Sequence, residues 1–89
     1  MPRFYFHIYN SLGFVPDEEG RKLGGPEQAL DEAVKGARSL LSSEVLEGQL
    51  DLRGRIEVTD ARGGHLCTVQ FGDVVYIKTG PVPNQGRAE

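Results

Sequence analysis

The stretch Arg3-Phe4-Tyr5-Phe6-His7-Ile8-Tyr9 decides the fold of this chain. Its density of aromatic and β-branched residues is typical of a strand in the middle of a sheet, and the turn formers Asn10-Ser11 end it. Side chains alternate between the two faces of a strand, so one face here is wholly apolar. The face expected to point into the core holds Phe4, Phe6 and Ile8, and the opposite face holds Arg3, Tyr5, His7 and Tyr9.

A second strand is expected to return beside the first, after the turn Asn10-Ser11-Leu12-Gly13. Two pieces carry strand-forming residues, Phe14-Val15 and Arg21-Lys22-Leu23, and residues 16–20 interrupt them. Proline has no N–H group to donate to a neighbouring strand, so Pro16 predicts that this second strand is an edge strand or a broken one.

A helix is predicted to begin within Gly24-Gly25-Pro26-Glu27 and to end at Gly48. Proline suits the first turn of a helix, and glycine suits the position just after the last turn. Apolar residues follow at spacings of three and four, which places them on one side of the helix. This predicted stripe comprises Leu30, Ala33, Val34, Ala37, Leu40, Leu41 and Val45.

A hairpin is predicted after Gly54. Residues 55–60 alternate cleanly, 61–64 supply turn residues, and 65–71 form the returning strand. Residues 73–78 fit either a short extra strand or a helical turn, and the pattern does not decide between them. Residues 79–89 are rich in proline and glycine and are expected to form a flexible tail, which leaves 1–78 as a single domain.

These elements predict an α+β fold, a two-layer sandwich with one helix on one face of a four-stranded antiparallel sheet. The chain order is ββαββ, and the expected spatial order of the strands is 2-1-3-4. Apolar residues of the first, third and fourth strands should face the helix, namely Phe4, Phe6, Ile8, Ile56, Val58, Val69 and Phe71. The sheet face without a helix, which we call the open face, is then the candidate binding surface, unless residues 73–78 cover part of it.

Composition narrows the function classes. The chain has 89 residues and a net charge of −3, and its basic residues are not clustered as nucleic-acid binding requires. The lone Cys67 cannot form an internal disulfide, which fits a reducing cytoplasm. The first apolar run is too short and too charged for a signal peptide, and no stretch approaches the roughly 20 apolar residues of a membrane span. We expect a cytoplasmic protein without membrane contact.

Several motifs together resemble a family of short bacterial proteins classed as a domain of unknown function. They are the opening Met1-Pro2-Arg3-Phe4-Tyr5-Phe6-His7-Ile8, then Asp17-Glu18-Glu19-Gly20, the alanine-rich helix, Ile56-Glu57-Val58-Thr59-Asp60 and Gly63. This resemblance implies a domain without an assigned activity or cofactor.

A second, looser resemblance is to HicB-like antitoxins, which run strand, strand, helix and bind a small toxin. Phe14-Val15-Pro16-Asp17, Gly20, Gly25 and the helix start at 27–33 carry it, and the chain departs from that pattern at Glu18-Glu19. It implies an antitoxin-like regulator.

No residue pattern predicts catalysis, a metal or a cofactor. His7 has the chemistry to ligate a metal or move a proton, but its available partners, His65 and Cys67, lack the close ligand spacing of zinc sites. We interpret His7 as a half-buried strand residue that bonds a neighbouring strand. The acidic run 17–19 does not match a calcium loop, and we interpret it as a solvated turn that protects a sheet edge.

The leading hypothesis is a non-enzymatic interaction module that forms a homodimer or binds a protein partner through the open face or a strand edge. The alternative is a weak nucleic-acid-binding or antitoxin-like regulator that uses the same tyrosines. No cofactor, metal, membrane or small-molecule substrate is expected. The candidate partner-binding residues are Arg3, Tyr5, His7, Tyr9, Arg55 and Thr59.

Overall fold

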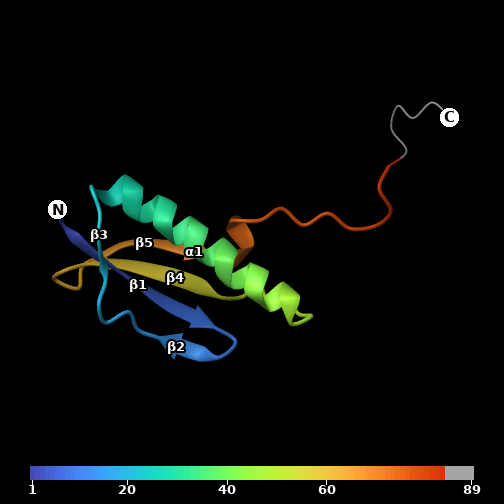
Figure 1. Ribbon diagram of the computed structural model, residues 1–89, viewed down its shortest axis with the longest axis horizontal. Coiled ribbons are helices and arrows are strands. Elements are labelled where there is room, and N and C mark those ends of the chain that lie inside the picture. The colour runs from blue at the N-terminus through green and yellow to red at the C-terminus, as the bar shows by residue number, and fades with distance from the viewer. Residues whose placement is uncertain (84–89) are drawn as a thin grey trace.

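The computed structural model describes residues 1–83, which form one helix packed on a five-stranded antiparallel sheet (Figure 1). The predicted α+β class, with the helix on one face of an antiparallel sheet, is confirmed. The elements in chain order are β1 (Arg3–Asn10), β2 (Gly13–Val15), β3 (Arg21–Lys22), α1 (Pro26–Leu46), β4 (Arg55–Asp60), β5 (His65–Gln70) and a 3-10 turn (Phe71–Asp73).

The strand order is β2-β1-β4-β5, with β3 also paired to β1. This is the predicted arrangement except that the expected second strand is two short strands, which makes five strands instead of four. β2 pairs with the C-terminal end of β1, and β3 pairs with its N-terminal end. Between them the Asp17 carboxylate accepts the Phe6 N–H at 3.0 Å, so a side chain replaces the neighbouring strand after Pro16.

The helix begins and ends where the glycines and proline predict. Pro26 stands in the first turn, and the helix closes with a Schellman motif around Gly48. The Gly48 N–H donates to the Val45 carbonyl at 2.9 Å, and the Gln49 N–H donates to the Glu44 carbonyl at 3.0 Å. Gly48 has a φ of 87°, a backbone conformation that glycine adopts without strain.

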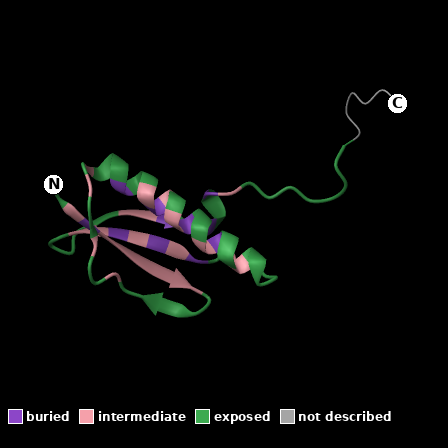
Figure 2. Ribbon diagram, in the orientation of Figure 1, coloured by how far each residue is buried: buried purple, intermediate pink, exposed green. Residues whose placement is uncertain are grey.

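The side of the helix that faces the sheet agrees with the predicted stripe at Ala33, Ala37 and Leu41 and differs from it at the two ends of the helix. The buried helix residues are Ala29, Ala33, Ala37 and Leu41, whereas Leu30 and Val45 are exposed. The spacing of four along the alanines gives a narrow line of small side chains, which lets the helix axis lie close to the sheet. Leu41 keeps its predicted place in the contact, Val34 and Leu40 are partly buried beside it, and only Leu30 and Val45 of the predicted stripe are exposed. Figure 2 shows the buried positions of α1 on the side of the helix that faces the sheet.

The core lies under α1 on the β4 and β5 half of the sheet. The helix contacts β4, β5 and the 3-10 turn. Five of the seven strand residues expected to face the helix are buried, and Phe6 and Ile8 are only partly buried beside them. Phe6 and Ile8 point to the helix side of the sheet as predicted, but they are less buried than expected, because one helix does not reach across to cover all of β1.

The chain after β5 turns under the helix and then leaves the body (Figure 1). Phe71 and Val74 are buried, and the Val74 carbonyl accepts a bond from Arg38 Nε at 2.9 Å. A helical turn at 71–73 is present, and no strand forms within 73–78. These contacts hold 71–74 on the helix side, so the segment does not cover the open face. Of the predicted tail 79–89, residues 79–83 are exposed and 84–89 lie outside the described residues.

We predict unequal costs for removing two phenylalanine rings from β1. Phe4 is 3% exposed, so Phe4→Ala should lower the free energy of unfolding by about 3–5 kcal/mol. Phe6→Ala should cost less, because the Phe6 ring already meets solvent on one side. Urea unfolding followed by circular dichroism measures both, with the exposed Val45→Ala as a control. Equal costs for the two phenylalanines would contradict the partial cover of β1.

Candidate functional site

The open face brings together most of the predicted candidate residues. β1 and β4 pair so that Tyr5 lies opposite Thr59, His7 opposite Glu57 and Tyr9 opposite Arg55. All of these side chains point away from α1, because their neighbours along each strand point into the core. Among the described residues no helix lies on this face.

An ordered row of side chains crosses the open face from β2 to β5. The Phe14 and Tyr9 rings stack with their centroids 4.6 Å apart, and Arg55 Cζ lies 3.9 Å above the centre of the Tyr9 ring. Arg55 Nε then donates to Glu57 Oε2 at 2.7 Å. We call this row, completed on β5 by Thr68 and His65, the open-face belt.

Within the belt, Glu57 of β4 makes the contacts to β5. Its Oε1 atom accepts the Thr68 hydroxyl at 2.6 Å and lies 2.9 Å from His65 Nε2. The hydrogen bond from Thr68, with those from Arg55 and His65, holds the pKa of Glu57 below its ordinary value, although partial burial opposes the shift. Glu57 is therefore an anion fixed in place at neutral pH, with both oxygens already bonded.

A β-bulge decides which side chains β5 gives to the belt. Val58 pairs with Cys67 while the next residue, Thr59, pairs with His65, so Leu66 is the extra residue. His65 stays on the open face, within 2.9 Å of Glu57 Oε1. Leu66 instead lines a small apolar hollow with Leu30 of the helix.

His7 is held by bonds to both of its ring nitrogens. The Asp17 backbone N–H donates to Nδ1 at 3.1 Å, so this nitrogen accepts and the ring proton lies on Nε2. Nε2 in turn donates to the Thr59 hydroxyl at 3.1 Å. The Tyr5 ring stacks beside it at 6.4 Å between centroids. The bond between His7 and Thr59 links β1 to β4, and both ring nitrogens of His7 are already hydrogen-bonded within the protein.

Arg3 is placed differently from the other candidates. Its guanidinium donates to the Glu19 carbonyl at 2.7 Å and holds the 16–20 loop against β1. Asp17 organises the same loop, because its Oδ1 atom accepts the N–H groups of Gly20 and Glu19. Gly20 has a φ of 69°, and a Cβ there would lie 2.8 Å from the Phe4 carbonyl oxygen. The acidic loop is therefore a fixed closure of one sheet edge.

The pKa of Asp17 reflects these bonds. Partial burial raises the pKa of the carboxyl, but the N–H donors of Phe6, Gly20 and Glu19, and the nearby His7, lower it more. The net pKa lies below the ordinary value, so the folded state favours the carboxylate.

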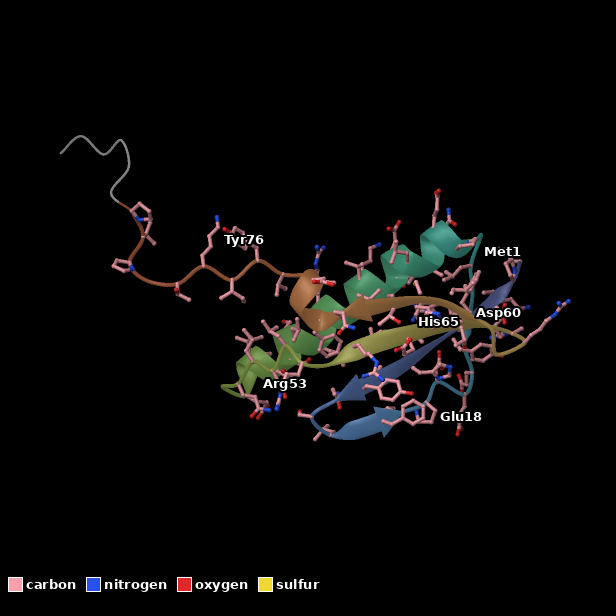
Figure 3. The ribbon with its side chains drawn as sticks, turned by 180° about the vertical axis from the view of Figure 1, so that it is seen from behind. Met1, Glu18, Arg53, Asp60, His65 and Tyr76 are labelled. Atoms are coloured by element: carbon pink, nitrogen blue, oxygen red, sulfur yellow. The ribbon has the colours of Figure 1, made fainter. Side chains whose placement is uncertain are left out.

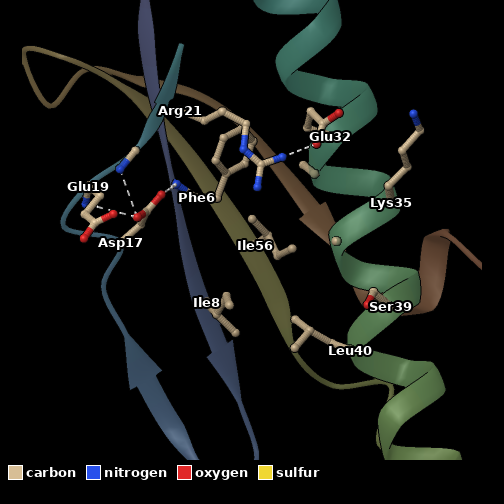
Figure 4. Close-up of a pocket in the computed structure, with 13 residues that line it drawn as sticks. Phe6, Ile8, Asp17, Glu19, Arg21, Glu32, Lys35, Ser39, Leu40 and Ile56 are labelled. Carbon is tan, nitrogen blue, oxygen red and sulfur yellow. Dashed lines mark hydrogen bonds and ion pairs between the residues drawn. The ribbon is translucent and has the colours of Figure 1, made fainter. Parts of the chain in front are cut away.

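A groove runs between α1 and β1, where the helix leaves the strand half covered (Figure 4). Its volume is about 610 Å³, and Phe6, Ile8 and Leu40 line its apolar part. An ion pair between Arg21 of β3 and Glu32 of α1 spans the groove. The groove is lined by both signs of charge and has no convergent set of polar groups of the kind that orients a small substrate.

Chemistry at either surface is limited by what the side chains already bind. Within residues 1–83 no group of three His, Cys, Asp or Glu side chains is arranged to hold a metal ion. Burial, together with the charge of Glu57, raises the pKa of the Cys67 thiol, which disfavours the reactive thiolate. The charges and rings of the belt are ordered by contacts with one another, so they would lose little further freedom against another surface.

Alternation in the sequence places Glu57 and Thr68 on the open face, but the predicted partner-binding residues leave out four members of the belt, namely Phe14, Glu57, His65 and Thr68. Phe14 could have been found from the tight turn, which sets it opposite Tyr9. Glu57 and Thr68 had the right alternation for the open face, yet nothing in the chain showed that they bond each other. The bulge that keeps His65 on this face depends on pairing with β4 and left no local signal.

Comparison with known proteins places the chain in a family. The model of the Domain of unknown function (DUF6894) matches residues 3–72. The chain belongs to the DUF6894 family. The matched part of this DUF6894 protein runs from β1 to the start of the 3-10 turn and so includes the whole sheet, the helix and the belt.

No curated protein and no solved structure matches this DUF6894 chain. None of the described helices has the length and apolar character needed to cross a membrane.

We predict that Asp17→Asn destabilises the protein by about 0.5–1.5 kcal/mol at pH 7, the usual value of one lost hydrogen bond. An amide has one acceptor oxygen, so Asn cannot serve both the Phe6 N–H and the loop. Because the folded pKa of Asp17 is lowered, its stabilising effect is present above the unfolded pKa, near 4, and is lost as pH falls below about 4.

Urea unfolding of both proteins between pH 7 and pH 3 tests this. The stability difference should narrow in acid, and the exposed Glu18→Gln is the matched control. A difference that is constant over this range would show that the Asp17 charge plays no part in closing the loop.

Proposed function

We propose that this DUF6894 protein is a small non-enzymatic interaction module, which dimerises or binds another protein through the open face of its sheet. The observation that carries the proposal is the belt from Phe14 to His65. Tyrosine, other aromatic residues and arginine are the residue types enriched at protein interfaces and at their energetic centres. Here they are stacked and ion-paired across all the main strands without a covering element among the described residues.

The belt also indicates what kind of partner would fit. Its β2 end, where Phe14 is 53% exposed and stacks on Tyr9, suits an apolar or aromatic patch. Its β5 end, with Glu57, Thr68 and His65, suits hydrogen-bonding side chains. A protein surface offers both within a short distance. A nucleic-acid strand would meet Glu57, and Arg55, the cation nearest the stacked rings, is already paired to that carboxylate.

The proposed setting is the bacterial cytoplasm. The lone Cys67 has no second cysteine in the chain to form a disulfide with, which suits a reducing compartment. The fixed side chains fit a binding role better than catalysis, because the hydrogen bonds of His7 and Glu57 are used within the protein.

A photo-crosslinking amino acid at position 14 tests the proposal in living cells. Phe14 and Val45 have similar exposure, 53% and 56%, and lie on opposite faces of the molecule, so Val45 is the matched control position. We expect covalent adducts with protein from position 14 and not from position 45. Adducts with a second copy indicate a homodimer, and adducts with another polypeptide indicate a heterologous partner.

Substitutions provide the second measurement. Phe14→Ser and Arg55→Ala should each weaken the captured association at least tenfold, which corresponds to about 1.4 kcal/mol, whereas Val45→Ser should leave it unchanged. Adducts with nucleic acid alone, or no adduct at either position, would overturn the proposal.

A further inference from the structure

We propose that residues 75–79 form an additional strand on the free edge of β5 in a second copy of this chain. The proposal rests on the interaction function above and names one partner, a second copy, and one contact, a strand edge. Three features of the molecule carry it: an open edge, a chain segment without backbone partners, and an anchor that keeps the two apart within one molecule.

The free edge is β5. Within residues 1–83 this strand pairs with β4 and with no other strand, so its outer N–H and C=O groups are available over six residues. It contains no lysine and no proline, the residues that commonly block an edge. The opposite edge of the sheet is closed by β2, β3 and the loop that Asp17 holds. Only one edge is therefore long enough to accept a strand.

The segment without partners follows Val74. Among the described residues the backbone of 75–83 makes no hydrogen bond, and the chain runs away from the body (Figure 3). Yet Val75, Tyr76 and Ile77 are strong strand formers. Tyr76 is 83% exposed and Ile77 is 46% exposed, an unusual state for two large adjacent residues. Pairing with another strand would satisfy the backbone N–H and C=O groups of this segment and bury its apolar side chains.

The segment also repeats the side-chain pattern of β1. Lys78 Nζ lies 5.3 Å from the centre of the Tyr76 ring, which puts these two side chains on one side of the chain. Val75 and Ile77 then lie on the other side. The sheet itself places apolar residues toward the helix, and tyrosine with polar residues on the open face. As an added strand, the segment would therefore place its apolar side chains on the helix side of the sheet and Tyr76 and Lys78 on the open face.

The receiving edge has room for the apolar side. A hollow of about 270 Å³ lies between the start of α1 and β5, lined by Leu30, Leu66 and Cys67 among others. The bulge in β5 turns Leu66 into this hollow, where it is 39% exposed beside Leu30 at 45%. Ile77 of an added strand would cover these two leucines, while Val75 keeps its partial packing against the core of its own copy. Five residues of strand span about 17 Å, close to the roughly 20 Å of β5.

The anchor explains why the segment does not pair with β5 of its own chain. Phe71 and Val74 are buried, and Val74 is bonded on both sides, through its N–H to the Phe71 carbonyl and through its carbonyl to Arg38. These contacts carry the chain under the helix and outward. Folding back along its own β5 would remove two core residues. Exchange between two copies keeps both anchors and satisfies both edges, which gives a closed pair.

Sedimentation velocity over a concentration series tests the proposal on the full chain. The wild type should move from monomer to dimer, and the double variant Tyr76→Pro with Ile77→Pro should remain monomeric, since proline removes the N–H groups that pairing needs. The thermal unfolding of the dilute variant should not change, because these two residues make no backbone bond in the monomer. Val82→Pro, at an exposed tail position beyond the segment, is the matched control and should still dimerise.

The accepting edge has its own variant. Leu66→Lys places a charge where the apolar side of the added strand would lie and should weaken dimerisation at least tenfold. Amide hydrogen exchange reports pairing directly: residues 75–79 should be protected in concentrated wild type and unprotected in Leu66→Lys. Rapid exchange of 75–79 in a sample shown to be dimeric would overturn the proposal.

The outcomes separate this inference from the proposed function. If the double variant Tyr76→Pro with Ile77→Pro still dimerises while Phe14→Ser is monomeric, the strand exchange is wrong and the dimer forms through the open face. If the wild type stays monomeric at all concentrations but position 14 still captures a protein, the exchange is again wrong and the interaction module stands. If there is neither a dimer nor an adduct, both are wrong.

Discussion

The packing of one helix on one half of one sheet is the constraint on which the remaining features depend. The line of Ala29, Ala33 and Ala37 brings α1 close to β4 and β5 and gives the core its depth there. A helix is only about 10 Å wide, so the same contact leaves the apolar side of β1 half covered, and within residues 1–83 no helix lies on the other face of the sheet. The groove beside β1 and the open face are therefore both direct results of building a domain from a single helix.

The open face shows how a small domain keeps such a surface ordered. Four of the five strands contribute to the row: β2 and β1 each give an aromatic ring, β4 gives a cation and an anion, and β5 gives hydroxyl and imidazole groups. Neighbours in this row are each other's partners. Under the proposed interaction function, these side chains would lose little further freedom on binding, and ordering them would take only a small part of the binding free energy.

Regular patterns in the sequence predicted most of the fold. Alternation in β1 and β4, together with the glycines and proline at the ends of α1, gave the elements, their order in the sheet and the direction of the core residues. The missed details depend on contacts between distant residues. The split of the second strand follows from the Asp17 carboxylate reaching the Phe6 N–H, and the exposure of Leu30 follows from the choice of alanines as the contact line. The candidate surface followed the same rule: alternation predicted that Tyr5, His7 and Tyr9 lie on the open face, whereas it did not predict the hydrogen bond from Arg3 to the Glu19 carbonyl.

The loop held by Asp17 limits how this sheet can grow. A fibre that grows by pairing of β-strands between molecules needs two free sheet edges on every subunit, so that each added molecule offers an edge to the next. In this protein one margin consists of strands of three and two residues, separated by Pro16 and by a carboxylate that has already taken the intervening amide. Stacking of molecules edge to edge along the sheet would stop after a single step. The acidic loop thus protects a domain with an uncovered sheet against fibre formation.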